Sequence, residues 1–279
     1  MVECSLCGGR AVYYRSSSGH FLCTSCLGRV LERAIRRTLS PLGALKPGSR
    51  ILIPVTYYNT LASLALLGIS LFMKRGYGSV IQVAIPDFIE LKYSGKLGRV
   101  NTLRVSVDPK PCYEDPVLAV HYDRLWSLRL ASLLGYNVIL MPLTRTDLTL
   151  LALEIPLRGH EAWGMLSLAT NVNGVMVVNA LANVEAEPIA SYATLLGFDF
   201  ETTTECRVKL RASHILRELR GLGPEVEFSS RRTLELILNT IKMRSKGRCV
   251  YCGEPVASGD VCELCNIIKN PTVKILPQP

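Results

Sequence analysis

Short apolar runs rich in β-branched residues alternate with longer helical patterns through the middle of the chain. The runs cover residues 50–55, 79–86, 103–107, 137–143 and 174–181. The helical patterns between them cover residues 60–75, 117–134, 147–157 and 184–197. Runs that are apolar on both faces and alternate with helices are typical of a parallel sheet covered on both sides. The pattern therefore predicts an α/β fold: a parallel sheet with helices on both faces.

After the last apolar run the chain becomes basic. Residues 206–221 form a basic segment, residues 231–246 have a helical pattern, and the proline-rich tail from residue 270 is expected to be loosely held. With 279 residues, of which 48% are hydrophobic, the chain can bury a substantial core. No apolar run reaches the ~18 residues of a membrane span, and the N-terminus lacks the pattern of a signal peptide. We therefore expect a cytoplasmic protein that does not enter a membrane.

Two blocks of paired cysteines lie at opposite ends of the chain. The first is Cys4-x2-Cys7, followed after 15 residues by Cys23-x2-Cys26, and the second is Cys249-x2-Cys252, followed after 9 residues by Cys262-x2-Cys265. Each CxxC turn presents two thiolates to one ion, so two turns complete a tetrahedral Cys4 site. Without an export signal, this pattern favours metal over the alternative, disulfide pairing. It predicts two structural Zn²⁺ sites, and His20 is interpreted as a surface residue because four cysteines suffice.

The net charge of +9 favours a polyanionic partner, with nucleic acid ahead of an anionic membrane surface. A generally basic solvated surface is the alternative explanation. Basic residues gather after the first cysteine block, in the basic segment, and before the second block. The expected RNA contacts are Arg33, Arg36, Arg37, Arg207, Lys209, Arg211, Lys242 and Arg244. Contacts of this kind with the phosphate backbone position RNA without reading its sequence.

The order of finger, basic helix, α/β domain and finger resembles the PP-loop family that makes 2-thiouridine in tRNA, which includes thermophile and archaeal T-loop thiolases and eukaryotic wobble-uridine thiolases. "CSLCGGRAVYYRSSSGHFLCTSC" looks like the family's first finger, "LKPGSRILIPV" like the lead-in to its PP-loop strand, and "CVYCGEPVASGDVCELCNIIK" like its second finger. The resemblance implies an adenine nucleotide alpha hydrolase-like fold, an archaeal source, a tRNA partner and dimers.

By this resemblance the chain divides into five parts. They are a zinc finger (1–27), a basic linker helix (28–47), a degenerate PP-loop α/β domain (48–205), a basic helical segment (206–247) and a second zinc finger with the tail (248–279). Family members use ATP to adenylate the uridine carbonyl, and an iron–sulfur cluster on three cysteines supplies or carries the sulfur. Each of these properties is an expectation that depends on specific motifs.

The nucleotide loop departs from the family pattern. In Ser-Gly-Gly-x-Asp-Ser the glycines let backbone N–H groups reach the pyrophosphate. The matching residues are Thr56, Tyr57, Tyr58, Asn59, Thr60 and Leu61. Two tyrosine rings would shield a backbone that only glycine leaves open, so we expect no ATP site in this loop. The two tyrosines are interpreted as fillers of the emptied pocket, whose hydroxyls need partners if they are buried.

A second family motif, Gly-His-Asn-x-x-Asp-Glu-Ala, matches residues 141–151. Only Asp147 remains at its second carboxylate, while Arg158-Gly159 at the following helix end is retained. Because Thr146-Asp147 opens an apolar helical run, Asp147 is interpreted as a helix N-cap rather than a catalytic group.

The family's cluster cysteines are also reduced in number. Its Pro-Cys-x-x-Cys segment keeps Cys112 and places Asp115 at the second cysteine, and its third cysteine is retained as Cys206. Two thiolates and one carboxylate are a poor ligand set for a [4Fe–4S] cluster, so an intact cluster is not expected. Cys112 and Cys206 are either ordinary buried small residues or a residual metal or redox site.

Three functions are compatible with these features. We favour a catalytically degenerate relative that binds tRNA or serves as a non-catalytic subunit in uridine thiolation, with an active thiolase paralogue or a second copy as partner. An active tRNA sulfurtransferase-like enzyme with an altered nucleotide or metal site is the second, with Cys112, Cys206 and Asp147 as residual candidates. The third is a protein-interaction scaffold without an RNA role.

Overall fold

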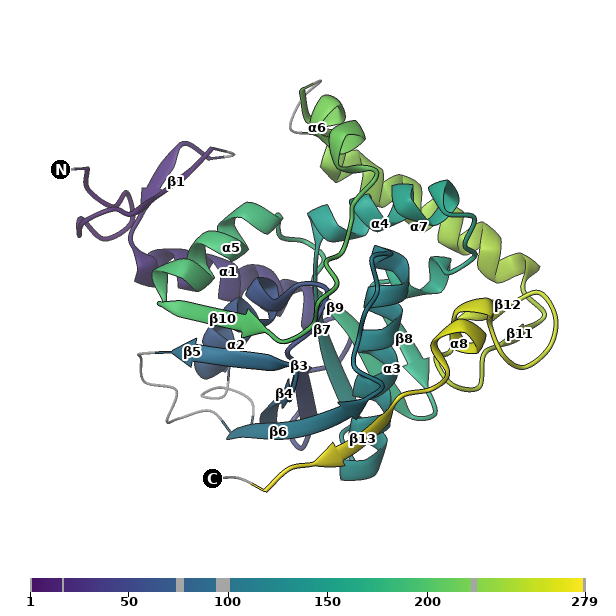
Figure 1. The fold of residues 1–279 in the computed structure, drawn as a ribbon. Coiled ribbons are helices and arrows are strands. Elements are labelled where there is room, and N and C mark those ends of the chain that lie inside the picture. Colours follow the sequence, from purple (N-terminus) through teal and green to yellow (C-terminus); the bar gives the residue numbers. More distant parts are fainter. Residues whose placement is uncertain (1, 17, 74–77, 94–100, 222–224, 278–279) are drawn as a thin grey trace.

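A seven-stranded sheet forms the centre of the molecule (Figure 1). The computed structural model describes residues 2–16, 18–73, 78–93, 101–221 and 225–277. The strand order is β13 (Thr272–Ile275), β6 (Asn101–Asp108), β4 (Val80–Pro86), β3 (Arg50–Pro54), β7 (Val138–Thr144), β9 (Val175–Leu181) and β8 (Ala169–Val172). The strands from β6 to β9 pair in parallel, whereas β13 and β8 are antiparallel edges. The predicted parallel sheet is confirmed, because each apolar run forms one of these parallel strands.

Helices cover both faces of the sheet, as predicted. On one face α1 (Thr24–Leu39), α2 (Thr60–Met73) and α5 (Ala186–Leu195) pack together, and on the other lie α3 (Pro116–Leu134), α4 (Arg145–Leu157), α6 (Ser213–Gly221) and α7 (Glu225–Arg244) (Figure 1). Local signals set the ends of α3: Asp115 caps its N-terminus, Pro116 occupies the first turn, and Gly135 ends it with a φ of 68°.

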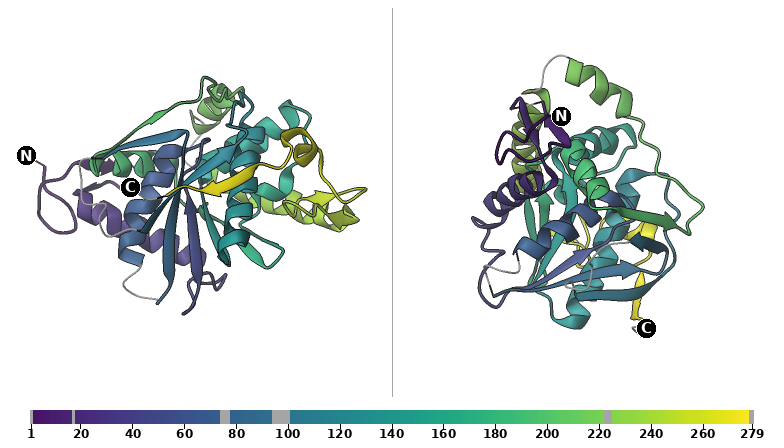
Figure 2. Two further views of the ribbon diagram at one scale, coloured as in Figure 1. Left: turned by 60° about the horizontal axis from the view of Figure 1, so that its bottom comes forward. Right: turned by 90° about the vertical axis from the view of Figure 1, so that its left-hand side faces the viewer.

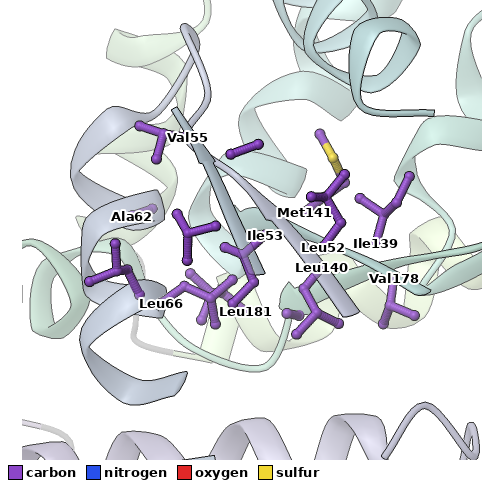
Figure 3. Packing of buried hydrophobic residues seen from close by; sticks show 14 of the residues in the cluster. Leu52, Ile53, Val55, Ala62, Leu66, Ile139, Leu140, Met141, Val178 and Leu181 are labelled. Atoms are coloured by element: carbon purple, nitrogen blue, oxygen red, sulfur yellow. The ribbon is translucent and has the colours of Figure 1, made fainter. Parts of the chain in front are cut away.

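The core lies where β3 and β7 meet the helices. Leu52 and Ile53 of β3 and Leu140 of β7 are completely buried. Figure 3 shows these side chains with Ala62 and Leu66 of α2 beside β3. Both faces of a central parallel strand are covered, which explains why these strands read as continuous apolar runs. Burying each large aliphatic side chain stabilises the fold by about 1.5–3 kcal/mol.

The expectation of a loosely held tail is wrong. Thr272–Ile275 form β13, which pairs antiparallel with β6 and completes one edge of the sheet. The prolines favoured a loop, but the segment also has two apolar residues at strand spacing, Val273 and Ile275. Val273 lies opposite Val107 of β6. The sequence interpretation also missed a separate antiparallel pair, β5 (Ile89–Tyr93) with β10 (Phe198–Thr202). Such short strands gain stability from their partners more than from their own sequence.

The two cysteine blocks lie on opposite sides of the α/β body (Figure 2). The first finger carries the hairpin β1 (Tyr13–Arg15) and β2 (His20–Leu22) and continues into α1. The second finger contains β11 (Gly247–Arg248), β12 (Pro255–Val256) and α8 (Glu263–Ile268). Within the described ranges, none of the helices has the length and apolar character needed to cross a bilayer.

The order of the strands changes direction at β3. From β3 the chain moves outward to β4 and β6, and then returns to place β7 and β9 on the other side of β3. Ligands of open α/β sheets bind at such a switch point, beyond the carboxyl ends of the strands. The loops after β3 and β7 meet at this place.

Candidate functional site

The loop after β3 is held by its own polar side chains. The Thr56 N–H donates to Ser63 Oγ at 3.0 Å, and Ser63 Oγ donates to the Asn59 carbonyl at 2.9 Å. Thr60 Oγ1 donates to the Thr56 carbonyl at 2.9 Å. Asn59 Oδ1 accepts the Ala62 N–H at 3.0 Å, which satisfies one free donor at the start of α2. The loop therefore has the strand–turn–helix outline of a phosphate site while its polar groups are already in use.

A buried carboxylate lies against the inner side of this loop. The backbone N–H of Tyr57 donates to Asp123 Oδ1 at 3.0 Å, and that of Tyr58 donates to Asp123 Oδ2 at 2.9 Å. The indole N–H of Trp126 donates to Oδ1 at 3.1 Å. Asp123 is 0% exposed. Successive backbone N–H groups at such a turn are an anion site, and here an anion of the chain itself occupies it.

Burial raises the pKa of Asp123 to about 7, and the donors from Tyr58, Tyr57 and Trp126 limit the rise. Desolvation disfavours the charged carboxylate, whereas each N–H group that it accepts favours it. No sequence pattern indicates this role, because Asp123 lies inside α3 and is 65 residues from Tyr58 along the chain.

The two tyrosines of the loop find partners for their hydroxyls, as a filler role requires. Tyr57 is 8% exposed, and its hydroxyl donates to the Cys206 carbonyl at 2.7 Å. Its ring meets Phe88 edge-on, with 6.5 Å between the ring centroids. Desolvation raises the pKa of Tyr58 well above its usual value, and the nearby Asp147 carboxylate raises it further. The hydroxyl of Tyr58 is thus buried beside Asp147, although part of the residue remains accessible.

Asp147 has a capping role, but not at the predicted position. The N-cap of α4 is Thr144, whose hydroxyl accepts the Asp147 N–H at 3.1 Å. Asp147 Oδ2 accepts the Thr144 N–H at 2.8 Å, which completes a capping box. The same oxygen accepts Asn59 Nδ2 at 3.0 Å, so Asp147 also joins the β7 loop to the β3 loop. Its carboxylate therefore stabilises both the start of α4 and the crevice, by which we mean the place where the loops after β3 and β7 meet.

Cys112 and Cys206 are brought together, although 94 residues separate them. They form a disulfide with their Cα atoms 5.0 Å apart. The interpretation of the two as ordinary buried residues is wrong, because Cys112 is exposed and Cys206 is half-buried. The loop before α3 and the segment after β10 both bring their cysteines to the carboxyl edge of the sheet. The pair is thus accessible at the edge where a ligand would bind.

Asp115 does not join these cysteines as a third ligand. Its Oδ1 accepts the Val117 N–H at 2.8 Å and caps α3. Its Oδ2 lies 2.9 Å from His160 Nε2 and 3.5 Å from Arg158 Nη1. Both carboxylate oxygens of Asp115 are therefore engaged by the protein. Asp115 is therefore held away from the disulfide by partners of its own.

Residues 206–212, which we call the strap, cross this edge of the molecule. At the start of the strap, the Cys206 carbonyl accepts the Tyr57 hydroxyl. Further along, the Lys209 N–H donates to the Glu114 carbonyl at 2.8 Å. Arg158 Nη2 donates to the Lys209 carbonyl at 2.6 Å, and the Ala212 N–H donates to Glu154 Oε1 at 2.6 Å. Glu154 is completely buried, and its other oxygen accepts Arg158 Nε at 2.7 Å. These contacts hold the strap over the loops after β3 and β6.

An open hollow of about 280 Å³ remains beside the loop and the strap. Tyr58 and Asn59 line it from the loop, Phe200 from β10, and Cys206 and Arg207 from the strap. The hollow has an exposed guanidinium and a sulfur at its mouth, but the N–H groups of the loop face Asp123 instead. The backbone donors of the loop are therefore directed at Asp123 and not at the hollow.

The first cysteine block forms a cluster that fits one metal ion. The sulfurs of Cys4, Cys7, Cys23 and Cys26 all lie within 4.8 Å of one another. Gly8 follows the first turn with a φ of 73°, which lets its N–H fold back to the Cys4 carbonyl at 2.9 Å. Four thiolates at this spacing suit a tetrahedral ion with metal–sulfur bonds of ~2.3 Å. His20 is exposed, in agreement with its interpretation as a surface residue.

The second block forms a cluster with an additional member. Cys249 and Cys265 have their sulfurs 3.6 Å apart, as do Cys252 and Cys262. His121 of α3 also reaches this cluster, with Nε2 3.2 Å from Cys265 Sγ. Nothing in the local sequence around His121 indicates a metal site, because the contact depends on how α3 packs against the second finger.

A solved structure has the same arrangement of elements. The U34-tRNA thiolase NcsA from Methanococcus maripaludis, with its [4Fe-4S] cluster, superposes with a TM-score of 0.70 over 97% of this chain and 96% of that chain. This chain has the fold of that tRNA thiolase. The sequence identity is 16%, so the likeness concerns the fold. No protein-family model and no curated protein matches the sequence.

The predicted RNA contacts occupy separate parts of this thiolase fold. Arg33 and Arg37 are exposed on α1, whereas Arg36 is half-buried and pairs with Glu32. Arg207, Lys209 and Arg211 are exposed on the strap, and Lys209 pairs with Glu114 at 2.6 Å. The side chains of Lys242 and Arg244 lie outside the described residues. The described basic residues therefore lie near the first finger and along the edge of the crevice.

Proposed function

We propose that this chain is a tRNA-binding relative of the tRNA thiolases that does not bind ATP at its β3 loop and acts as a non-catalytic subunit in tRNA uridine thiolation. One observation carries the proposal. The two N–H groups that a nucleotide phosphate would need already donate to the buried carboxylate of Asp123. The shared fold supplies the connection with tRNA thiolation.

Electrostatics makes phosphate binding at this loop unfavourable. A pyrophosphate would have to displace Asp123 from Tyr57 and Tyr58 while it stayed close to the same buried carboxylate. Two unit charges 4 Å apart repel by about 4 kcal/mol at an effective dielectric constant of 20. The buried ring of Tyr57 adds a steric obstacle on the same side. The loop therefore favours its own carboxylate over an external anion.

The charge distribution supports a polyanionic partner. The chain carries a net charge of +9, and exposed arginines lie on α1 and the strap. The two fingers lie on opposite sides of the body, so an extended RNA could contact both ends of the molecule (Figure 2). Phosphate contacts of this kind release counterions, and the affinity should therefore fall steeply with salt.

We further propose that both cysteine clusters hold Zn²⁺. The measured sulfur–sulfur distances of 3.6 Å in the second cluster suit thiolates that share one tetrahedral ion. The larger core of an iron–sulfur cluster would spread its thiolates further apart. At Cys112 and Cys206, the engagement of Asp115 with His160 and Arg158 argues against an intact [4Fe–4S] cluster.

The decisive experiment measures ATP and bulk tRNA binding to the purified, zinc-loaded protein by calorimetry at two salt concentrations. We expect tRNA binding that weakens as salt increases and no specific ATP binding. Each of the single variants Arg207→Glu and Arg211→Glu should weaken tRNA binding, whereas Lys274→Glu, at an exposed site on β13, serves as the charge-matched control. Specific ATP binding would overturn the proposal in favour of an active enzyme. Binding of neither ligand would favour a protein-interaction scaffold.

A further inference from the structure

A histidine of the α/β body reaches the metal cluster of the second finger. His121 lies on α3, 144 residues before Cys265, and is completely buried. Its Nε2 atom is 3.2 Å from Cys265 Sγ and 4.0 Å from Cys262 Sγ. The same nitrogen and the sulfurs of Cys252, Cys262 and Cys265 all lie within 4.8 Å of one another. The cluster thus has five potential donor atoms around a position that takes four.

The other ring nitrogen decides which role suits His121. Its Nδ1 atom is buried and has no hydrogen-bond partner in the described part of the chain. If Nε2 were bound to the metal, the proton would sit on Nδ1, and a buried N–H donor would lack an acceptor. Metal-bound histidines almost always donate that second N–H to a partner, and buried N–H groups without one are rare. The proton therefore belongs on Nε2, where it faces the sulfurs.

Charge gives a second reason for a donor at this place. Four thiolates around one divalent ion leave two negative charges in excess. Three of the four cysteines are less than a tenth exposed, so water cannot stabilise this charge. Arg124, also on α3, donates through Nη2 to the Cys252 carbonyl at 3.0 Å. α3 therefore presents two polar side chains to the same cluster, His121 to its sulfurs and Arg124 to its backbone.

The second finger is packed closely enough for such a contact to be fixed. A Cβ atom at Gly253 would lie 2.7 Å from Val172 Cγ2, so the CxxC turn lies directly against β8. A Cβ atom at Gly164 of the short helix η1 (Trp163–Leu166) would lie 2.6 Å from Pro255. Only glycine allows both approaches without a shift of the chain. The cluster is held at the surface of α3 rather than on a separate arm.

We propose that His121 is a positioning residue of the C-terminal metal centre: its Nε2–H donates to the metal-bound thiolates of Cys265 and Cys262 and fastens the second finger to α3. The same contact then slows the release of the metal and holds the second finger against α3. The inference concerns the metal centre alone and does not depend on RNA or ATP binding. It assigns to α3 a role that the spacing of the cysteines does not indicate.

The test compares His121→Phe, which keeps bulk but removes the donor, with His121→Gln, which keeps an N–H donor. Full-length zinc-loaded proteins are mixed with a chromophoric chelator. The release of the C-terminal metal should be at least about tenfold faster in His121→Phe, in line with typical effects of such outer hydrogen bonds, and largely restored in His121→Gln. His20→Phe, beside the first cluster, is the matched control and should not change this phase.

Cobalt substitution provides a readout that a packing defect would not move. The wild type should show the absorption of two Cys4 centres. Loss of the N–H donor should leave four sulfurs but shift the sulfur-to-cobalt charge-transfer band of one centre to lower energy. A wild-type spectrum with one Cys3His centre would overturn the proposal by making His121 a ligand. Equal rates of metal release in the wild type, His121→Phe and His121→Gln would also overturn it. If His121→Phe does not fold, the cobalt spectrum of the wild type and the rate of metal release from His121→Gln still test the proposal.

Discussion

At the scale of single residues, Asp123 determines what the β3 loop can bind. Its two oxygens receive the N–H groups of Tyr57 and Tyr58, and the Trp126 indole fixes its orientation. A loop with the outline of a phosphate site thereby becomes a contact between two parts of the same chain. The loss of the glycines and the presence of this carboxylate are complementary, since each makes a bound phosphate less favourable.

The raised pKa of Asp123 makes a prediction about stability and pH. The pKa increases from 3.8 to about 7 in the folded protein, so the folded state binds an additional proton between these values. The contribution of Asp123 to stability should therefore be greatest below about pH 4 and fall as the pH rises to about 7, by up to about 4 kcal/mol. Asp123→Asn, which does not titrate, should lack this contribution.

The measurement is the free energy of unfolding in urea from pH 4 to 8 for the wild type and Asp123→Asn. The difference between the two curves gives the pH-dependent contribution of Asp123 to the free energy of unfolding. Asp199→Asn, at an exposed site on β10, is the control and should follow the wild type. Parallel curves for the wild type and Asp123→Asn would show that the carboxylate is not shifted.

Residue roles that depend on near neighbours could be predicted, and those that depend on packing could not. The tyrosines of the loop and the capping role of Asp147 follow from local chemistry, although the N-cap itself is Thr144. Asp123 and His121 lie on α3 among residues that read as an ordinary buried helix. The loop N–H groups that bind Asp123 and the sulfur beside His121 are at least 65 residues away, so no local pattern indicates these contacts.

At the scale of elements, the strap connects the β3 loop, the loop before α3 and the end of α4. Its anchor at the far end is Glu154, which joins the Ala212 N–H to the guanidinium of Arg158. A completely buried carboxylate with two donors is a strong anchor, since its loss leaves Arg158 with the more distant carboxylate of Asp115. The basic composition of this segment indicated a surface for RNA, but not that it crosses the crevice.

We expect Glu154→Gln to loosen the strap. The amide can still accept one hydrogen bond, but the charged partner at Arg158 Nε is lost while Asp115 Oδ2 stays at 3.5 Å, and the protein should be destabilised by about 1.5–3 kcal/mol. Amide hydrogen exchange in residues 207–212 should be at least about tenfold faster, which mass spectrometry can measure. Glu161→Gln, an exposed neighbour, is the matched control. Unchanged exchange in the strap would mean that its other contacts suffice.

The elements themselves differed in how well the sequence revealed them. The five parallel strands are long apolar runs because both of their faces are covered, and all five were predicted. β5, β8, β10 and β13 are short or partly exposed strands with antiparallel partners. Their sequences alone carry little preference, so pairing in the folded chain determines them.

At the scale of the whole molecule, two cysteine clusters of unequal exposure lie at opposite sides of the body. In the first finger Cys7 is exposed and Cys23 is half-buried. In the second finger Cys249, Cys252 and Cys265 are buried against the body. A chelator must approach the metal through these surroundings, so the two centres should differ in accessibility.

We expect metal release from the wild type to occur in two phases of equal amplitude, a fast one from the first finger and a slow one from the second. Structural zinc contributes directly to folding, so the slow phase should coincide with loss of stability. Cys7→Ser should remove the fast phase and leave the slow one, as followed by absorbance of a chromophoric chelator. A single phase in the wild type would contradict the difference in exposure.

The edge strand β13 has a consequence for how the protein is made. Strand β6 pairs with Thr272–Ile275, and Thr272 lies 164 residues after Asp108 in the sequence. Until the ribosome releases them, β6 presents a row of unpaired N–H and C=O groups on an apolar sheet. The nascent chain therefore stays open to wrong pairing until residues 272–275 have emerged, and a truncation before Thr272 should reduce the yield of soluble protein.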